Sequence, residues 1–315
     1  MKCVVTGCAG FIGSHLAERL LADGHRVVGV DGFTDYYPRA IKESNLAGFR
    51  DHPSFQFHER DLAEGKLEAV VDGADYVFHL AAMPGLTRSW VDFDTYARCN
   101  LTATHRLLDA LKGAKSLKKF VYASTSSVYG KYASGDESLP TRPSSPYGIT
   151  KLAGEQLARV HLDEFEVPTV VLRFFSVYGP RQRPEMGYHL FIKWILEGTP
   201  IKLTGDGLQV RGNTYVDDCV EAVVRAGFHA TPGEVFNLGG GEITTIIDAI
   251  RTIERLTGKP AKIERHPPRP GDQLATAADV TKLYRHLGWK PTTGLEAGLA
   301  KQIEWQRGLS GDLTP

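Results

Sequence analysis

The stretch Thr6-Gly7-Cys8-Ala9-Gly10-Phe11-Ile12-Gly13 decides the fold, because it joins a short β-branched run to an amphipathic segment. Its glycines have the spacing G-x-x-G-x-x-G between an expected strand and an expected helix. Gly7 allows a tight turn, Gly10 lets the backbone approach a pyrophosphate, and Gly13 lets the helix pack closely on the strand. Unpaired N–H groups at the start of the helix can bind the anion. We predict a dinucleotide-binding turn; the alternative is a glycine turn that only joins two elements.

Short β-branched apolar runs alternate with amphipathic stretches over the first half of the chain. This alternation is typical of βαβ units, which build a parallel sheet covered by helices on both faces. The sequence therefore predicts an α/β fold with a doubly wound parallel sheet of six strands. The expected strands are Lys2–Thr6, Arg26–Asp31, Ser54–Asp61, Tyr76–Ala81, Lys119–Ser124 and Thr169–Phe174, and the helices between them include Gly13–Ala22, Thr95–Leu111 and Tyr147–Phe165.

The pattern changes after Gly179, where a loop rich in proline and arginine follows. We expect a smaller, interleaved C-terminal substrate domain from about 176–212 and 239–315, and a dinucleotide-binding domain from 1–175 with about 213–238. The run Val235–Leu238 could return to the first sheet. The expected helices of this half are Tyr188–Glu197, Asp217–Phe228, Val280–Leu287 and Glu296–Arg307.

Composition excludes several classes of protein. The 37 lysines and arginines balance 37 aspartates and glutamates, so no net charge attracts nucleic acid or an anionic membrane. No apolar run reaches the roughly 20 residues of a membrane helix, and the N-terminus has no signal-peptide pattern. The four cysteines lack C-x-x-C spacing, so neither a zinc site nor a disulfide framework is indicated. We expect a cytoplasmic protein without a metal site and without a nucleic-acid or membrane partner.

Two aspartates end expected strands. Asp31 follows the glycines at close to the ~20-residue spacing at which dinucleotide folds place the acid that bonds the adenosine ribose. A carboxylate there repels a 2′-phosphate, and Gly32 and Phe33 follow it instead of an arginine, so NAD is favoured over NADP. Asp61 could accept a hydrogen bond from the adenine amine or cap the next helix, and the two roles can coexist.

Tyr147 and Lys151 lie four residues apart and therefore on one face of an expected helix. A tyrosine with an ordinary pKa of ~10 needs a nearby cation to act as a general base, and Lys151 could supply it. The pattern alone is weak evidence, since the segment Tyr36–Lys42 also brings tyrosine and lysine together, and we interpret that segment as surface. Tyr147 is distinguished by its place after the fifth strand.

That strand ends in Ser124-Thr125-Ser126-Ser127. Ligands of open α/β sheets bind at the carboxyl ends of the strands, so these hydroxyls could hold a sugar hydroxyl and share its proton. The alternative is that some of them bond to the backbone.

These motifs resemble those of the extended short-chain dehydrogenase/reductase superfamily, specifically its nucleotide-sugar epimerases and dehydratases. The resemblance covers essentially the whole chain and implies a Rossmann domain that holds NAD tightly and a C-terminal domain that holds a nucleoside-diphosphate sugar. It implies Tyr147, Lys151 and Thr125 as catalytic residues. The matching segments, in family order, are 7–13, 79–82, 124–130, 145–151, 173–180 and 269–272.

The resemblance also implies contacts and a partner. Relatives commonly form homodimers through a four-helix bundle, to which Thr95–Leu111 and Tyr147–Phe165 correspond. The implied NAD contacts are Gly7, Gly10, Phe11, Ile12, Gly13, Asp31, Asp61, Leu62, Leu80, Ala81, Ala82, Asn100, Ala123, Ser124, Tyr147, Lys151 and Phe174. The implied UDP-sugar contacts are Pro84, Gly85, Arg88, Thr125, Ser126, Ser127, Tyr147, Ser176, Arg183, Met186, Arg211, Arg269 and Asp272.

Ser126 and Ser127 separate the subfamilies. The 4,6-dehydratases resemble S-T-D-E-V-Y-G and the UDP-glucuronate decarboxylases S-T-S-E-V-Y-G at this point. Without a carboxylate here, elimination lacks its acid and base, so reversible oxidation at C4 is favoured. The runs His79–Trp90 and Arg181–Met186 look most like UDP-glucuronate 4-epimerases. We expect an NAD-dependent isomerase for UDP-glucuronate; the alternatives are a UDP-glucose or UDP-N-acetylglucosamine 4-epimerase, a UDP-glucuronate decarboxylase, and an NAD-binding sensor.

A glucuronate needs its carboxylate held. Arg183 could supply charge-assisted bonds, with the hydroxyls of Thr125–Ser127 and Ser176 forming a cradle around it. Diphosphate and solvent are alternative partners for Arg183, and solvent is one for Arg88.

Two further arginines, Arg211 and Arg269, are expected to clamp the diphosphate, because two guanidinium groups match its oxygens better than one. Asp272 would then accept from a ribose hydroxyl. Gly212-Asn213 stands where relatives usually carry Asp-Phe, which leaves the orientation of Arg211 open.

Overall fold

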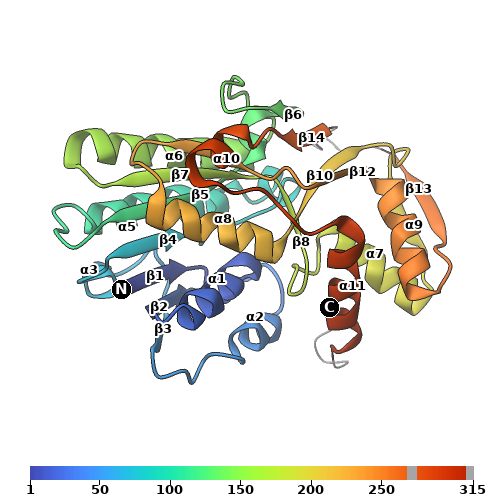
Figure 1. Ribbon diagram of the computed structural model, residues 1–315, viewed down its shortest axis with the longest axis horizontal. Helices are drawn as coiled ribbons and strands as arrows, with labels where there is room; N and C mark the ends of the chain where they lie inside the picture. Colours follow the sequence, from blue (N-terminus) through green and yellow to red (C-terminus); the bar gives the residue numbers. More distant parts are fainter. Residues whose placement is uncertain (268–274, 310–315) are drawn as a thin grey trace.

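A parallel sheet of seven strands forms the centre of the computed structural model, which describes residues 1–267 and 275–309 (Figure 1). The strand order is β11-β7-β5-β4-β1-β2-β3. Strands β2 and β3 follow β1 on one side, and the chain then crosses to add β4 on the other side of β1, as in doubly wound folds. The predicted α/β class is confirmed, and β11 makes the sheet one strand wider than the six predicted. The strands are β1 Lys2–Thr6, β2 Arg26–Asp31, β3 Phe55–Glu59, β4 Tyr76–His79, β5 Lys119–Thr125, β7 Thr169–Phe174 and β11 Val235–Leu238.

Side chains alternate between the two faces of this sheet and fill two separate cores. On one face Cys3 and Val5 pack with α1 (Phe11–Ala22) and α8 (Val216–His229). On the other face Val4 packs beneath helices that include α3 (Glu68–Val71) and α5 (Ala103–Ala110). Because both faces are covered, the strands consist of almost continuous apolar runs.

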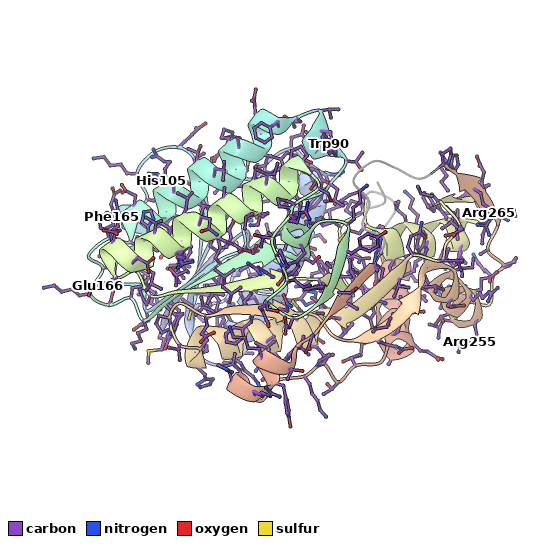
Figure 2. All side chains as sticks on the ribbon, turned by 90° about the horizontal axis from the view of Figure 1, so that it is seen from above. Trp90, His105, Phe165, Glu166, Arg255 and Arg265 are labelled. Atoms are coloured by element: carbon purple, nitrogen blue, oxygen red, sulfur yellow. The ribbon has the colours of Figure 1, made fainter. Side chains whose placement is uncertain are left out.

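The helix expected over Thr95–Leu111 is interrupted. It consists of α4 (Phe93–Ala97), a π-helical turn over Arg98–Thr102, and α5. It runs beside α6 (Pro146–Phe165) along one side of the molecule (Figure 2). Single π-turns often occur at functional sites, and this one carries Asn100.

Helix α6 begins where the sequence predicts. The Ser145 hydroxyl accepts a hydrogen bond from the N–H of Gly148 at 3.1 Å, and Pro146 occupies the first turn, where a missing N–H costs nothing. Tyr147 is therefore held in the first turn, at the carboxyl end of the sheet.

A second sheet lies beside the first (Figure 1). Its strands were not predicted, because each is short and has little apolar alternation. Strand β6 comes from the first half of the chain, yet it pairs with β14 of this sheet. The strands are β6 Tyr132–Gly135, β8 Ser176–Tyr178, β10 Val210–Tyr215, β12 Glu242–Thr245 and β14 Ala275–Ala278, and β9 Ile201–Thr204 pairs separately with β13 Ile263–His266.

The helices of the second half agree with the predicted segments to within a residue or two, and one further helix, α9, was missed. They are α7 Gly187–Glu197, α8, α9 Ile246–Thr257, α10 Thr281–Leu287 and α11 Leu295–Arg307; α2 Arg39–Leu46 is additional in the first half. Among the described residues, no helix combines the length and apolar character needed to cross a bilayer.

Candidate active site

A cleft opens at the carboxyl ends of the first sheet, where doubly wound folds bind their ligands. It encloses about 1180 Å³, open solvent included. All of the expected NAD contacts except Asn100 line it, and so do Pro84 and Arg183 from the expected sugar contacts. The lining residues that sequence reasoning missed are Val30, Gly32, Thr34, Tyr36, Tyr37, Lys42, Arg60, Met83, Cys99 and Ala103.

The glycine turn forms one wall of the cleft and leaves no room for side chains. Gly7 has a φ of +72°, which L side chains rarely adopt. A Cβ atom at Gly13 would lie 2.1 Å from the carbonyl oxygen of Gly7. Helix α1 can therefore approach β1 this closely only with glycine at position 13.

Hydrogen bonds hold the carboxylate of Asp31 against this turn. Its carboxylate accepts hydrogen bonds from the N–H groups of Ala9 at 3.2 Å and Phe33 at 2.9 Å. Burial raises the pKa of Asp31, and the nearby Lys42 ammonium opposes this shift. The carboxylate is thus oriented before any ligand binds.

Asp61 accepts from the N–H of Ala63 at 2.8 Å and forms an ion pair with Arg98. Asp61 therefore caps the turn after β3 and not the next helix, α3, which begins only at Glu68, and Asp61 also lines the cleft.

The interpretation of Tyr36–Lys42 as surface is wrong. Tyr36, Tyr37 and Lys42 all line the cleft, and Lys42 is only 7% exposed. Its ammonium donates to the carbonyl of Thr34 at 2.8 Å. Helix α2 folds this segment back over the sheet, and the sequence pattern does not show that packing.

The strand-end threonine meets the helical tyrosine, which lines the cleft. Thr125 and Tyr147 are hydrogen-bonded through their side chains. Burial raises the pKa of Tyr147, while this bond and the charge of Arg183 oppose the rise. The phenol is therefore protonated at neutral pH in the protein alone, and it needs a closer cation to act as a base.

Lys151 lies one helical turn below Tyr147, with its ammonium 4.3 Å from the ring centre of Tyr122. Burial lowers its pKa to about 7, against the opposing charge of Glu155. Near neutrality Lys151 can therefore exist in both its charged and its neutral form.

A buried ionic network beneath the cleft was missed by sequence reasoning. The Arg173 guanidinium donates to both oxygens of Glu155, at 3.1 and 2.8 Å, and to the hydroxyl of Tyr129 at 2.8 Å. Ser124 donates to the same carboxylate, so its hydroxyl is occupied by the protein. Glu155 thus ties α6 to β5 and β7, one turn beyond Lys151.

Asn100 supports the cleft from outside its lining. Its amide oxygen accepts from the N–H of Met83 at 2.7 Å, and its amide nitrogen donates to the carbonyl of Met83 at 3.1 Å and to the hydroxyl of Thr150 at 3.0 Å. The side chain connects the loop after β4 to α6, which carries Tyr147 and Lys151.

The expected hydroxyl cradle is partly self-bonded. Thr125 donates to the Ser127 hydroxyl and accepts from the Ser127 N–H, both at 3.2 Å. Thr125, Ser126 and Ser127 are all buried. Ser176 lies further along, in β8, where it pairs with Asn213.

Arg183 reaches the cleft but already has a partner. Its guanidinium donates to Glu185 at 2.7 Å, and the side chain is 24% exposed. Arg88 forms an ion pair with Asp92 at 3.2 Å, is 41% exposed, and lies 5.4 Å from the ring centre of Tyr36.

Two more of the expected sugar contacts, Met186 and Gly85, lie in the loops around Arg183 and Arg88. The N–H of Met186 donates to the carbonyl of Arg183 at 3.0 Å. Gly85, with a φ of +93°, presents its carbonyl to the hydroxyl of Tyr96 at 2.9 Å.

The Gly212-Asn213 departure has a structural explanation. The buried Asn213 amide donates to the carbonyl of Arg211 at 3.0 Å and accepts from the hydroxyl of Tyr188 at 2.7 Å. Arg211 itself donates to the carbonyl of Val210 at 2.8 Å. Two other expected sugar contacts, Arg269 and Asp272, lie outside the described residues.

A pH dependence of stability follows from Lys151. Its folded pKa of about 7 lies below the ~10.4 of an unfolded lysine, so the unfolded chain binds more protons between these values. This group therefore makes the protein more stable as the pH rises through that window, by up to ~1.4 kcal/mol per pH unit.

Lys151→Met removes this pH dependence. The stability of the variant relative to wild type should fall between about pH 7 and pH 9.5 in urea titrations at equal dinucleotide occupancy. A difference that stays constant would contradict the assignment.

Comparison with known proteins agrees with this geometry. Residues 3–239 match the NAD dependent epimerase/dehydratase family. An uncharacterized UDP-glucose epimerase, YtcB, from Bacillus subtilis is 42% identical over 98% of this chain and 99% of its own length. A UDP-glucuronate 4-epimerase from Thermodesulfobacterium geofontis is 37% identical over 96% and 95%. The crystal structure of UDP-glucuronic acid 4-epimerase from Bacillus cereus, in complex with UDP-glucuronic acid and NAD, matches with a TM-score of 0.95 and 42% identity over 98% and 99%. The chain therefore belongs to the NAD dependent epimerase/dehydratase family.

Proposed function

We propose that the protein is an NAD-dependent isomerase that converts UDP-glucuronate to UDP-galacturonate. One observation carries this proposal: Tyr147 lines the cleft together with Lys151 and is hydrogen-bonded to Thr125, and the neighbouring positions 126 and 127 carry serines. The pair can move a proton at a sugar hydroxyl, and the serines cannot serve as the acid and base of dehydration. The relatives named above point to the same class of reaction.

The glycine turn, Asp31 and the cleft walls suit a dinucleotide, because they combine close backbone approach with a fixed carboxylate. A bound NAD would be held by the glycine turn and Asp31, and it would supply the acceptor and then the donor for the C4 hydride. Tyr147 removes the O4 proton in the first half of the reaction and gives it back in the second. Thr125 positions the hydroxyl, and the Lys151 ammonium favours the phenolate.

Arg183 is proposed to hold the glucuronate carboxylate, in exchange for its present partner Glu185. Charge-assisted bonds of a guanidinium to a carboxylate are among the strongest available at such a site. The geometry that they impose matters, since a C4 ketone beside C5 makes the C6 carboxylate prone to leave as carbon dioxide.

When Arg183 no longer holds the carboxylate, part of the substrate is expected to lose carbon dioxide and to appear as a UDP-pentose. Arg183→Gln should raise the share of UDP-pentose among the products by at least about tenfold, which corresponds to ~1.4 kcal/mol of lost discrimination. Thr125→Val should also raise the share of UDP-pentose, at a lower overall rate of turnover. Arg181→Gln is the matched control, because Arg181 pairs with Glu18 at 2.7 Å and does not line the cleft. An unchanged product ratio in Arg183→Gln would argue against the carboxylate contact.

The test of the function is a product assay. Purified protein is incubated with UDP-glucuronate and no added NAD, beside UDP-glucose and UDP-N-acetylglucosamine, and the products are resolved by proton NMR. Formation of UDP-galacturonate would support the proposed reaction and would also indicate that the purified protein retains NAD. UDP-xylose would instead identify a decarboxylase, and turnover of the neutral sugars alone would identify an epimerase of the other class. No turnover of any of the three, with NAD bound, would favour a sensor.

We also propose a cytoplasmic homodimer. Apolar side chains are exposed on α6 and on the approach to α4, where a second copy could cover them. They are Trp90, Val91, Phe93, Ile149, Val160 and Phe165. Sedimentation velocity should give a mass of twice the 34.6 kDa of one chain.

A further inference from the structure

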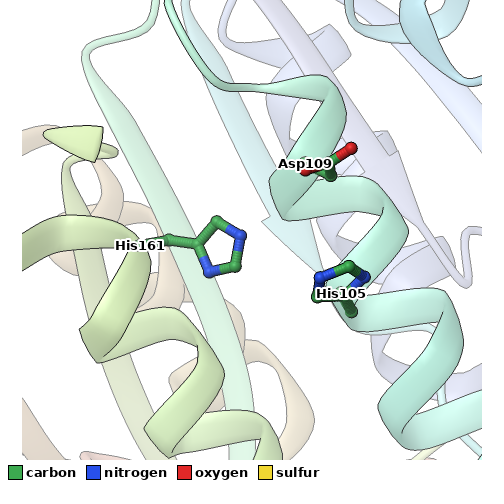
Figure 3. A group of neighbouring side chains, drawn as sticks. All are labelled: His105, Asp109 and His161. Atoms are coloured by element: carbon green, nitrogen blue, oxygen red, sulfur yellow. The ribbon is translucent and has the colours of Figure 1, made fainter. Parts of the chain in front are cut away.

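Three side chains of kinds that can bind a metal ion lie close together between α5 and α6 (Figure 3). His105 and Asp109 are four residues apart on α5 and share one helical face. His161 extends from α6 toward them. One ligand atom from each residue lies within 4.8 Å of those of the other two. None of the three lines the cleft, so the proposed epimerase chemistry leaves this cluster unexplained.

The surroundings of His161 leave one of its ring nitrogens available to a metal ion. Its side chain is buried, with 4% exposure, and its Nδ1 lies 2.8 Å from the carbonyl oxygen of Leu157. A carbonyl can only accept, so in this contact Nδ1 carries the hydrogen, and the neutral ring then holds a lone pair on Nε2. Nε2 is buried without any hydrogen-bond partner. Metal-binding histidines characteristically donate their second ring N–H to a carbonyl in this way.

The other two side chains can adjust to an ion. The rings of His105 and His161 are 5.8 Å apart at 77°. Asp109 forms an ion pair with Lys112 at 2.6 Å, and the Lys112 ammonium also lies 4.0 Å from the ring centre of Phe165. Exposed pairs of this kind contribute little to stability, so an ion can displace the ammonium.

We propose that His105, Asp109 and His161 bind one divalent transition-metal ion, with zinc as the physiological candidate. Two imidazoles and one carboxylate are typical zinc ligands, and a water molecule completes a tetrahedron. Ligand atoms around zinc lie about 3.4 Å apart, given bonds of 2.0–2.2 Å. The ligand atoms, which lie within 4.8 Å of one another, have to move closer together to reach that spacing, and the side chains of His105 and Asp109 are exposed. The bound ion links α5 to the helix that carries Tyr147 and Lys151.

The experiment measures binding to the full chain, purified without a histidine tag, stripped with EDTA and dialysed. Zinc sulfate is titrated calorimetrically, and bound metal is counted by mass spectrometry. Wild type should bind one zinc per chain. His105→Gln and Asp109→Asn alter exposed positions and should each weaken binding by at least the ~10–100-fold seen for loss of a supporting residue. His229→Gln, at another exposed helical histidine, is the matched control and should bind as wild type does.

A spectroscopic readout tests the geometry. Cobalt substituted for zinc should give the intense visible absorption of a tetrahedral site in wild type and lose it in the His105→Gln/Asp109→Asn double variant. Binding that is equal in wild type and the double variant would overturn the proposal. One ion shared by two chains would also overturn it, because all three ligands come from one chain. Epimerase activity of the two variants is measured in parallel, and it should stay unchanged because neither residue contacts the cleft.

Discussion

Replacing Tyr147 with phenylalanine is expected to reduce turnover of UDP-glucuronate by at least ~10³-fold, since the reaction then lacks the group that removes and returns the O4 proton. The change deletes one hydroxyl, which is bonded to Thr125, and keeps the half-buried ring. Initial rates by proton NMR, with protein at matched NAD content, measure the effect.

The control is Tyr76→Phe, which deletes a hydroxyl from a buried tyrosine of β4 that does not line the cleft. It should retain nearly full activity. Tyr147→Phe must show wild-type circular dichroism and unfolding for the result to count. If a folded Tyr147→Phe protein kept more than a tenth of the wild-type rate, the assignment of Tyr147 as the proton-transfer group would be wrong.

Replacing Glu155 with glutamine is expected to lower the free energy of unfolding by about 3–5 kcal/mol, because it leaves the buried Arg173 guanidinium without its counter-charge. The hydroxyl of Ser124 loses a charged acceptor in the same step. Urea titrations of wild type and variant give the difference directly.

Two further variants separate the buried charge from a general loss of packing. Glu155→Leu combined with Arg173→Met removes both charges and should cost less than Glu155→Gln alone. Glu296→Gln breaks the exposed ion pair with Arg255 and should barely change stability. If Glu155→Gln and Glu296→Gln had the same small effect, the network would not be a stability element.

The first sheet could be predicted from the sequence because its signals are local. β-branched runs define its strands, and the glycine turn at Gly7–Gly13 and the cap at Ser145 act within a few residues. The second sheet could not be predicted in this way. Strand β6 gains its place only by pairing with β14, more than a hundred residues later, and neither has an apolar pattern of its own.

The same distinction holds for the site. Tyr147 and Lys151 are related by one helical turn and follow the fifth strand, and these two features together suggested them as a pair. The end of that strand suggested only the group of hydroxyls at 124–127, and the family resemblance singled out Thr125 among them. Glu155 was missed because its partner Arg173 lies on β7, the next element of the chain, and only the packing of α6 on the sheet brings the two side chains together.

Packing between helices likewise created the His105 and His161 cluster. No spacing rule links α5 to α6 across the fifth strand. The sequence therefore suggested no metal site here.

The position of β11 has a consequence for synthesis on the ribosome. Strand β7 has β5 on one side and β11 on the other, yet β11 follows β7 in the chain only after β8, α7, β9, β10 and α8. Until Val235–Leu238 emerges, β7 presents an open edge that can pair with the wrong chain. The two sheets are therefore expected to be completed together late in translation, and a fragment that ends near residue 175 should be prone to aggregate.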